Sequence, residues 1–387
     1  MNFNYYPLDA KEKAIRSEIW NALKTKRPFN GAAVNITSYP DWDDCVQKVM
    51  PADQIPLADV SAERNAEWDE NIRGQIHREL VCSVSRYQCD RFPAIAVPRS
   101  IFGQTQGLAE IFGSRLIPVP NEDHLYFPVP CIEEPKDVEN LRVKPVEDCM
   151  YGNAVPFMKY AYESTEGQLA THNPVMTGPI DTANYIMGTT RLMEWIYDYP
   201  QSLHSLLDII TEQLIKLILS MQAAVGGNIC PECASCLPCG YSFCSEVRHL
   251  ISKETYDEFE APYLRRISET CGLYAYHSCG TYERVLETDM RDNNLMLVNF
   301  QTKEMDLKKV HGITGGRLSL SVGRSVNLHE RYMFPDNDAF YNHFFNEFPG
   351  PAPVEVSVND VDTFINVFET TKGGKLGDRS GIRVKTR

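Results

Sequence analysis

The sequence lacks any segment that could cross a bilayer. Its longest apolar stretch, LIKLILSMQAAVGG, falls short of the roughly 20 residues that a membrane-spanning helix requires. The N-terminus, MNFNYYPLDAKEKAIRSEIW, carries acidic residues and has no apolar core of signal-peptide length. We therefore expect a cytoplasmic protein without membrane association.

Positive charge is also scarce. The chain of 387 residues has 38 Lys and Arg against 52 Asp and Glu, which gives a formal net charge of -14. A net acid is attracted neither to nucleic acid nor to an anionic membrane surface, so we expect broad binding to neither, although this leaves a local basic pocket open. Internal repeats and a Gly-rich dinucleotide fingerprint are absent too. With 43% apolar residues, the chain can bury a large core.

What the chain does have is cysteine, with 12 residues of this type. Because the cytosol keeps thiols reduced, we expect free thiols and metal ligands in place of disulfides. Most of them need no function, since a free cysteine is commonly a small buried apolar residue.

Short apolar runs alternate with stretches of helical periodicity. The clearest helix begins at Pro200 and ends before Gly226, with apolar residues at intervals of three and four. About seven or eight strand-helix units in some 300 residues favour an α/β fold, namely a (β/α)8 TIM barrel. The runs expected as strands are FPAIAV, HLYFPV, NPVMTG, GGNICPE, LYAYH, LMLVNF and RLSLSVG.

The first part of the chain differs from the rest. Residues 1–90 read as mainly helical and loop-like, which predicts an N-terminal extension or lid, and residues 91–387 are assigned to the barrel. In that fold the active site lies at the C-terminal ends of the strands, in the loops that lead to the helices.

One candidate site follows the run LYAYH. His277 and Cys279 end this run, and Gly280 then permits a sharp turn. Residues i and i+2 of an extended chain point to the same side, so an imidazole nitrogen and a thiolate can converge on one zinc ion. The alternative is a buried histidine held by one hydrogen bond beside an inert cysteine.

The second candidate is CPECASCLPC, residues 230–239, in which every third residue is a cysteine. The spacing resembles an iron-sulfur run, but the fourth cysteine of such runs is spaced differently and is followed by proline, whereas Pro238 precedes it here. A zinc ribbon needs a second cysteine pair further downstream, and the only later cysteines are Cys244, Cys271 and Cys279. Three readings stay open: a loop without metal, an iron-sulfur cluster, and a ligand contributed to a shared zinc site.

Several blocks together resemble the uroporphyrinogen decarboxylase superfamily, which includes zinc and corrinoid methyltransferases. The resemblance covers about residues 90–325, and its most specific points are Gly178 with Pro179, Gly188, Pro200, Pro262 and the pair His277 and Cys279. It implies a (β/α)8 barrel. The blocks are HNPVMTGPIDTANYIMGTTRLMEWIYDYPQSLHSLLDIITEQLIKLILSMQAAVGGNICPE, LISKETYDEFEAPYLRRISE and AYHSCGTYERVLE.

Within that superfamily the sequence is closer to the methyltransferases. The RQAGRY-type stretch of the decarboxylases and the aspartate after it are missing in that form. The methyltransferases hold zinc with His-x-Cys and a later cysteine; His277 and Cys279 match the pair, but no cysteine follows Cys279. The resemblance places Glu232 at the acidic position that ends the preceding strand, as a catalytic residue.

The missing third ligand leads to a specific hypothesis. The loop after Glu232 would supply the third thiolate from Cys233, Cys236 or Cys239, with Cys236 chosen for the zinc site. If the loop supplies none, Glu232 and His311 are the next ligands to test.

The resemblance implies a corrinoid-dependent methyltransferase that moves a methyl group to a small thiol or folate acceptor with the help of zinc. A partner protein would supply the corrinoid, because no D-x-H-x-x-G cobalamin motif occurs in the chain. The alternatives are a uroporphyrinogen decarboxylase acting on a tetrapyrrole and a non-catalytic metal-binding barrel.

Overall fold

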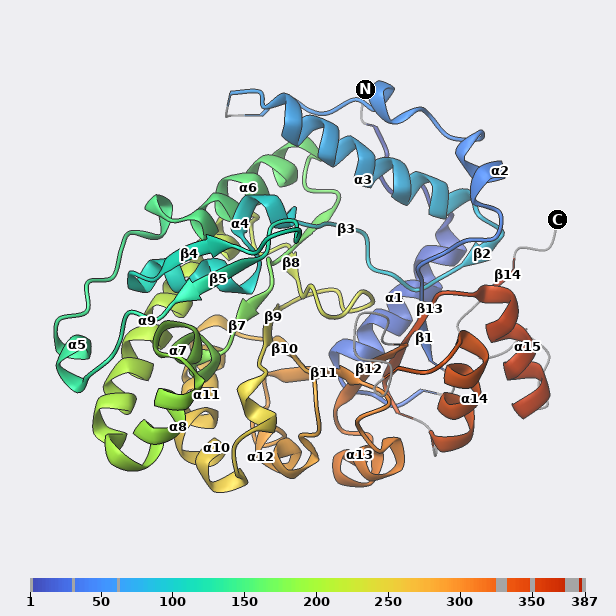
Figure 1. The fold of residues 1–387 in the computed structure, drawn as a ribbon. Helices are drawn as coiled ribbons and strands as arrows, with labels where there is room; N and C mark the ends of the chain where they lie inside the picture. Colours follow the sequence, from blue (N-terminus) through green and yellow to red (C-terminus); the bar gives the residue numbers. More distant parts are fainter. Residues whose placement is uncertain are drawn as a thin grey trace.

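A parallel sheet of seven strands forms the centre of the fold (Figure 1). The computed structural model describes residues 3–29, 32–60, 63–324, 333–348, 352–372 and 383–384. In spatial order the strands are β1 (Ala33–Ile36), β13 (Val354–Val358), β12 (Ser319–Gly323), β11 (Leu295–Gln301), β10 (Tyr274–Ser278), β9 (Tyr241–Cys244) and β7 (Met176–Thr177). Their runs of buried apolar residues are typical of parallel strands covered on both faces.

A second parallel sheet continues this arrangement with β3 (Ala94–Ile95), β6 (Ala170–His172) and β8 (Ile229–Cys230). The Gly240 N–H donates to the Ile229 carbonyl at 3.1 Å, which links the two sheets. At the other edge, the Asp90 N–H donates to the Val34 carbonyl at 2.8 Å. The α/β class with parallel strands is confirmed, and the arrangement is like a TIM barrel. Closure of eight strands into one continuous ladder stays a prediction, because the pairing divides into two sheets.

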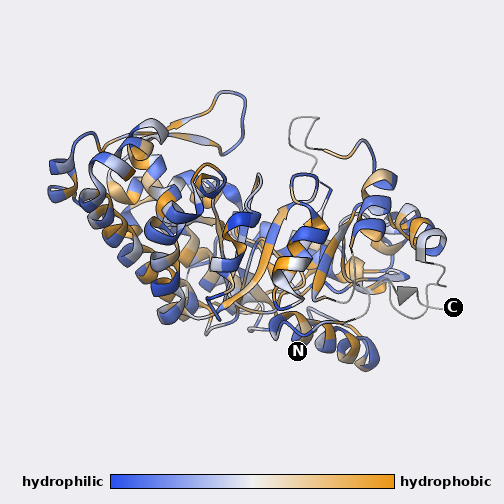
Figure 2. Ribbon diagram, turned by 90° about the horizontal axis from the view of Figure 1, so that it is seen from below, coloured by the Kyte–Doolittle hydropathy of each residue, from blue (hydrophilic) through white to orange (hydrophobic). Residues whose placement is uncertain are grey.

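Helices follow most of the strands and cover the sheet (Figure 1). Polar and apolar colours alternate along these helices in Figure 2, as expected of helices that bury one face. Helix α9 (Pro200–Ala224) matches its prediction, with Pro200 in its first turn and the expected apolar face buried. The other helices of this part are α4 (Arg99–Phe102), α5 (Pro135–Glu139), α6 (Ala154–Ser164), α7 (Pro179–Met187), α8 (Thr189–Asp198), α10 (Lys253–Phe259), α11 (Ala261–Cys271), α12 (Leu286–Asp289), α13 (Leu307–Thr314), α14 (Asn337–Glu347) and α15 (Val361–Lys372).

The first 90 residues contain α1 (Ala10–Lys24), α2 (Trp42–Val46) and α3 (Ala66–Val84). They also supply β1, which pairs with β13 over its whole length. The boundary at residue 90 stays a prediction, but this segment is in part built into the central sheet. None of the helices in the described part of the chain has the length and apolar character that a bilayer crossing requires.

One predicted strand lies elsewhere. HLYFPV forms β5 (Tyr126–Val129), which pairs antiparallel with β4 (Arg115–Pro118) in a hairpin outside the central sheet. The side chains of Ile117 and Phe127 in this hairpin are exposed. Near the C-terminus, β14 (Arg383–Val384) pairs antiparallel with β2 (Tyr87–Gln88).

Candidate functional site

A row of polar residues crosses five neighbouring strands of the sheet. Cys244, His277, Asn299, Ser321 and Glu355 are successive Cα partners on β9, β10, β11, β12 and β13. Partners in adjacent strands point to the same face, so this row, which we call the strand-end row, gathers polar side chains on one face of the sheet, from the C-terminal end of β9 to the start of β13.

Three side chains converge at one end of the strand-end row, and a fourth lies beside one of them. One ligand atom each of Cys244, Glu246 and His277 lies within 4.8 Å of the others. The Cys279 sulfur is 3.5 Å from His277 Nε2, and the Cys244 thiol donates to Glu246 Oε1 at 3.4 Å. All four residues are half-buried. We call this set the Cys-Glu-His-Cys group.

The imidazole of His277 is oriented for use of its Nε2 atom. Its Nδ1 lies 2.5 Å from Asn299 Oδ1, an atom that only accepts, so Nδ1 carries the proton. The lone pair of Nε2 therefore faces Cys279. The sequence-based alternative, a histidine held by one hydrogen bond beside a cysteine, describes the same contact but leaves out Cys244 and Glu246.

The thiols of this group are not free nucleophiles by themselves. Burial, and next the Glu246 carboxylate, raise the pKa of Cys279 to about 12, and the same causes raise the pKa of Cys244 well above its usual range. Thiolates need a neighbouring positive charge to persist at neutral pH. The arrangement therefore suits a bound cation better than covalent catalysis.

Glu232 lies within electrostatic range of this group. Its side chain is exposed, yet burial raises its pKa, while Arg99 and His277 lower it. The electrostatic effect of His277 on Glu232 shows that the two are neighbours, and the catalytic role of Glu232 stays a prediction.

Cys236 is not part of the Cys-Glu-His-Cys group. Its side chain is buried among Leu23, Ala33 and Leu297, and its N–H donates to Glu355 Oε2 at 2.8 Å. The predicted set of His277, Cys279 and Cys236 is therefore not brought together as a whole: Cys279 lies beside His277, and the second thiol near this imidazole is that of Cys244.

The sulfur atoms of the loop cysteines also do not converge on one point. The Cys230 sulfur lies 3.3 Å from Nδ1 of His172. In the described ranges, which include all of residues 230–239, no three of these thiols have sulfur atoms within 4.8 Å of one another. The loop thiols are thus not placed to share a single metal ion, and the iron-sulfur reading of this loop stays a prediction. His311 lies on α13 with its ring against Phe348, outside the group.

Sequence reasoning missed Cys244 and Glu246, although a signal was present. YSFCSE ends a strand with Cys-x-Glu, in the same way as AYHSC ends the next strand with His-x-Cys. Two i, i+2 pairs on adjacent parallel strands place four ligand atoms at one edge. The missing information was that β9 and β10 are neighbours.

Two buried carboxyl groups hold the backbone behind the site. Asp181 accepts from the Ser245 hydroxyl and from the Glu246 N–H at 2.7 Å. Glu260 accepts from the Ile180 N–H at 2.9 Å and from the Tyr276 hydroxyl at 3.1 Å. Burial raises the pKa of Asp181 to about 7 and that of Glu260 to about 8.

These raised values predict how stability depends on pH. The folded form keeps the Glu260 proton up to about pH 8, whereas the unfolded chain loses it near its usual pKa of 4.5. The contribution to stability is therefore complete below pH 4.5 and is lost as the pH rises to 8. We expect the melting temperature to fall by a few degrees between pH 6 and pH 8.5.

Glu260→Gln is the matched variant, because its amide can accept from Ile180 and donate to the Tyr276 oxygen. It should melt several degrees above the wild type at pH 8.5 and close to it at pH 6, by scanning calorimetry. An unchanged difference between the two pH values would contradict the assignment to Glu260.

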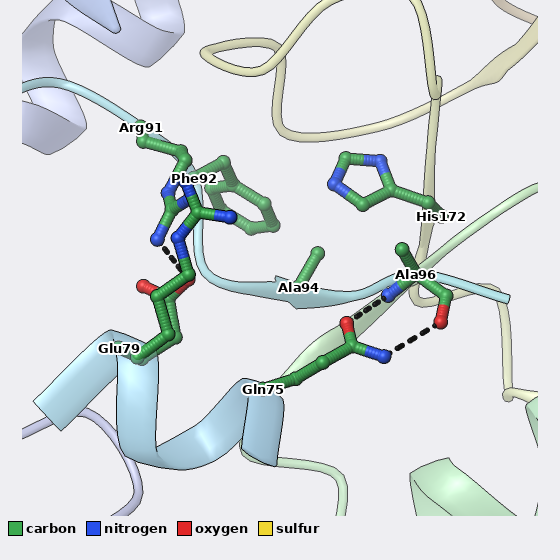
Figure 3. A pocket seen from close by; sticks show the side chains of 8 residues that line it. Gln75, Glu79, Arg91, Phe92, Ala94, Ala96 and His172 are labelled. Carbon is green, nitrogen blue, oxygen red and sulfur yellow. Dashed lines mark hydrogen bonds and ion pairs between the residues drawn. The ribbon is translucent and has the colours of Figure 1, made fainter. Parts of the chain in front are cut away.

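A separate cavity of about 130 Å³ lies between α3 and β3 (Figure 3). Gln75, Phe92, the ion pair of Glu79 with Arg91, and His172 line it. His172 Nδ1 lies 3.0 Å from the Pro231 carbonyl, and burial lowers the pKa of this imidazole to about 4. Arg78 also lines this cavity, so it carries positive charge in addition to the Glu79–Arg91 pair, and the Cys-Glu-His-Cys group does not line it.

The comparisons with known proteins agree with one another. The family model described as uroporphyrinogen decarboxylase (URO-D) matches residues 77–321. A methylated-thiol–coenzyme M methyltransferase of Methanosarcina mazei is 28% identical over 118 residues, which are 29% of this chain and 28% of that protein. The match thus spans less than a third of the relative. A solved methyltransferase structure from Methanosarcina mazei has a TM-score of 0.60 at 16% identity, covering 92% of this chain and 98% of that one, and shares the fold.

Proposed function

Because the chain belongs to the uroporphyrinogen decarboxylase (URO-D) family, we propose that it is a methyltransferase that moves a methyl group from a corrinoid protein to a small thiol with the help of zinc. The observation that carries this proposal is the Cys-Glu-His-Cys group at the ends of β9 and β10. Two thiols and an imidazole form a typical zinc donor set.

The residues present fit zinc. Sulfur and nitrogen ligands of one tetrahedral zinc are about 3.6 Å apart when calculated from ordinary bond lengths, and the Cys279 sulfur and His277 Nε2 are 3.5 Å apart. Asn299 holds the histidine with Nε2 unprotonated, as a ligand requires. His277, Cys279 and Cys244 would hold the metal, and Glu246 would take the proton that the Cys244 thiol loses. Bound zinc would lower the pKa of an acceptor thiol and so supply a thiolate at neutral pH.

The chain itself would then place the acceptor and remove its proton. Glu232 is exposed to solvent and burial raises its pKa, so it is suited to take the proton of the acceptor thiol. The new bond joins sulfur to the methyl carbon, and the cobalt–carbon bond breaks with both electrons left on cobalt. The remaining requirement is alignment of sulfur, carbon and cobalt, which the rigid strand ends provide.

Because the reaction leaves both electrons on cobalt, the reduced cobalt product can be assayed. Zinc-loaded protein mixed with methylcob(III)alamin and a thiol should produce cob(I)alamin, measured by its absorbance under anaerobic conditions. Coenzyme M is the first thiol to test, because the Methanosarcina mazei relative is named for it. We expect the rate to fall at least tenfold in Glu232→Gln, since general-base catalysis contributes about 100- to 10,000-fold.

Three results would overturn the proposal. Release of carbon dioxide from uroporphyrinogen at enzymatic rates would make the protein a decarboxylase. Methyl transfer to tetrahydrofolate that is independent of added zinc and of His277 would assign a different acceptor and remove the metal from the reaction. Absence of every activity in a protein that binds zinc tightly would favour a metal-binding barrel.

A further inference from the structure

The strand-end row continues beyond the metal candidates, and its hydrogen bonds run in one direction. Glu355 is buried on β13 and accepts from three donors: the Ser235 N–H at 3.0 Å, the Cys236 N–H at 2.8 Å and the Ser321 hydroxyl at 3.4 Å. Three donors surround this group, so the carboxylate form satisfies them all. Glu355 therefore ends the row as an acceptor.

The donor and acceptor roles at Ser321 also fix the orientation of the Asn299 amide. Since the Ser321 hydroxyl donates to Glu355, it can only accept from its other neighbour. Asn299 Nδ2 lies 2.8 Å from that hydroxyl and 3.2 Å from the Ser321 carbonyl, which is also an acceptor. Two acceptors thus fix which end of the Asn299 amide carries its hydrogens. Its oxygen is left to face His277 Nδ1 at 2.5 Å.

The other end of the row reaches the cysteine loop. The two N–H groups that Glu355 binds belong to residues 235 and 236, a few positions after Glu232. Asn35 Nδ2 also donates to the Ser235 hydroxyl at 3.0 Å. These hydrogen bonds hold the loop against the sheet, although its cysteines do not form a single-metal site of their own.

We propose that Asn299 and Glu355 are positioning residues of the strand-end row: Asn299 fixes the His277 proton on Nδ1, and Glu355 fixes the loop that carries Glu232. The proton assignment is independent of zinc, whereas the effect on metal affinity rests on the proposed function. The tautomer and the zinc affinity are measured separately, so failure of the proposed function can be told apart from failure of the positioning role.

The tautomer can be read by nitrogen NMR. The full chain labelled with 15N-histidine, free of metal at pH 8, should show His277 as the Nδ1–H form, with His277→Ala identifying its signals. Asn299→Ala should shift the signal to the Nε2–H form, which free imidazole side chains favour. Asn299→Asp should restore Nδ1–H, because a carboxylate oxygen also accepts. A retained Nδ1–H form in Asn299→Ala would overturn this assignment.

Zinc affinity gives the second readout, by competition with a chelator. We expect Asn299→Ala to bind zinc about 10- to 100-fold more weakly, as loss of a hydrogen-bond partner of a ligand histidine does in other sites, and Asn299→Asp to recover most of this loss. If the tautomer responds as expected while the wild type binds no zinc, the positioning role stands and the proposed function fails. Equal affinity in wild type and Asn299→Ala would contradict the effect on the metal.

Glu355→Gln tests the loop end of the row. One N–H of the loop then faces an amide NH2 in place of an oxygen, so hydrogen exchange of residues 233–239 should become at least tenfold faster, by mass spectrometry. The His277 tautomer should not change, because the Ser321 carbonyl still holds Asn299. Unchanged loop exchange would refute the role of Glu355. Loss of Nδ1–H in this variant would refute the separation of the two roles.

Discussion

His277→Ala is expected to weaken zinc binding by at least about 100-fold and to reduce methyl transfer to the thiol below detection. Catalytic zinc sites commonly use three protein ligands, and removal of one leaves a pair that binds weakly. The measurements are zinc content after dialysis against a chelator and the cob(I)alamin assay. Because the strands hold the site and the metal does not hold the strands, the melting temperature without zinc should change little.

A comparison of two cysteines identifies the third ligand. Cys244→Ser should lose zinc as fully as Cys279→Ser does, since the Cys244 sulfur lies in the group with His277. Cys236→Ser is the matched control, because Cys236 is a buried thiol packed in a different cluster. It should keep its zinc. The reverse result, loss in Cys236→Ser and retention in Cys244→Ser, would restore the ligand set expected from the sequence.

The sequence carried the local part of this site. An apolar run that ends in His277 and Cys279 shows its i, i+2 geometry directly, and the structure places both at the end of β10. The partners Cys244 and Glu246 depend on which strands are neighbours, which is a long-range property. The cysteine loop has no strand or helix periodicity, so the side that each thiol faces could not be inferred from its spacing.

The same distinction applies to the fold. The α9 prediction succeeded because 25 residues of regular periodicity specify a helix and its buried face. HLYFPV was wrongly assigned to the barrel, because a short apolar run looks the same in a surface hairpin and in a central strand. The strands β1 and β13 were not predicted. AVNI and VEVSV are short, and their pairing joins residues more than 300 positions apart.

The second large effect concerns an arginine at the back of the site. Arg248 is fully buried and pairs with Asp289 at 2.5 Å, and its guanidinium lies 4.0 Å from the ring centre of Tyr276 and 4.7 Å from that of Tyr282. Tyr276 precedes His277, and the Tyr282 hydroxyl donates to the Asn299 carbonyl at 3.2 Å. The ion pair thus supports the strand ends that carry the ligands.

Asp289→Ala is expected to destabilise the protein by about 3–5 kcal/mol, because it leaves a buried charge without its partner, and to lower the melting temperature by roughly 10 °C. In the described part of the chain, Nε and Nη1 of Arg248 already have no hydrogen-bond partner, so no spare acceptor can replace the carboxylate. Asp208→Ala is the matched control. It breaks an Arg–Asp pair of similar length, 2.6 Å to Arg266, that is about half exposed, and exposed pairs contribute only about 0–1 kcal/mol. The melting temperatures of both variants are measured by calorimetry. Equal melting temperatures would contradict the role of Asp289, because the aromatic rings around Arg248 would then suffice to stabilise its charge.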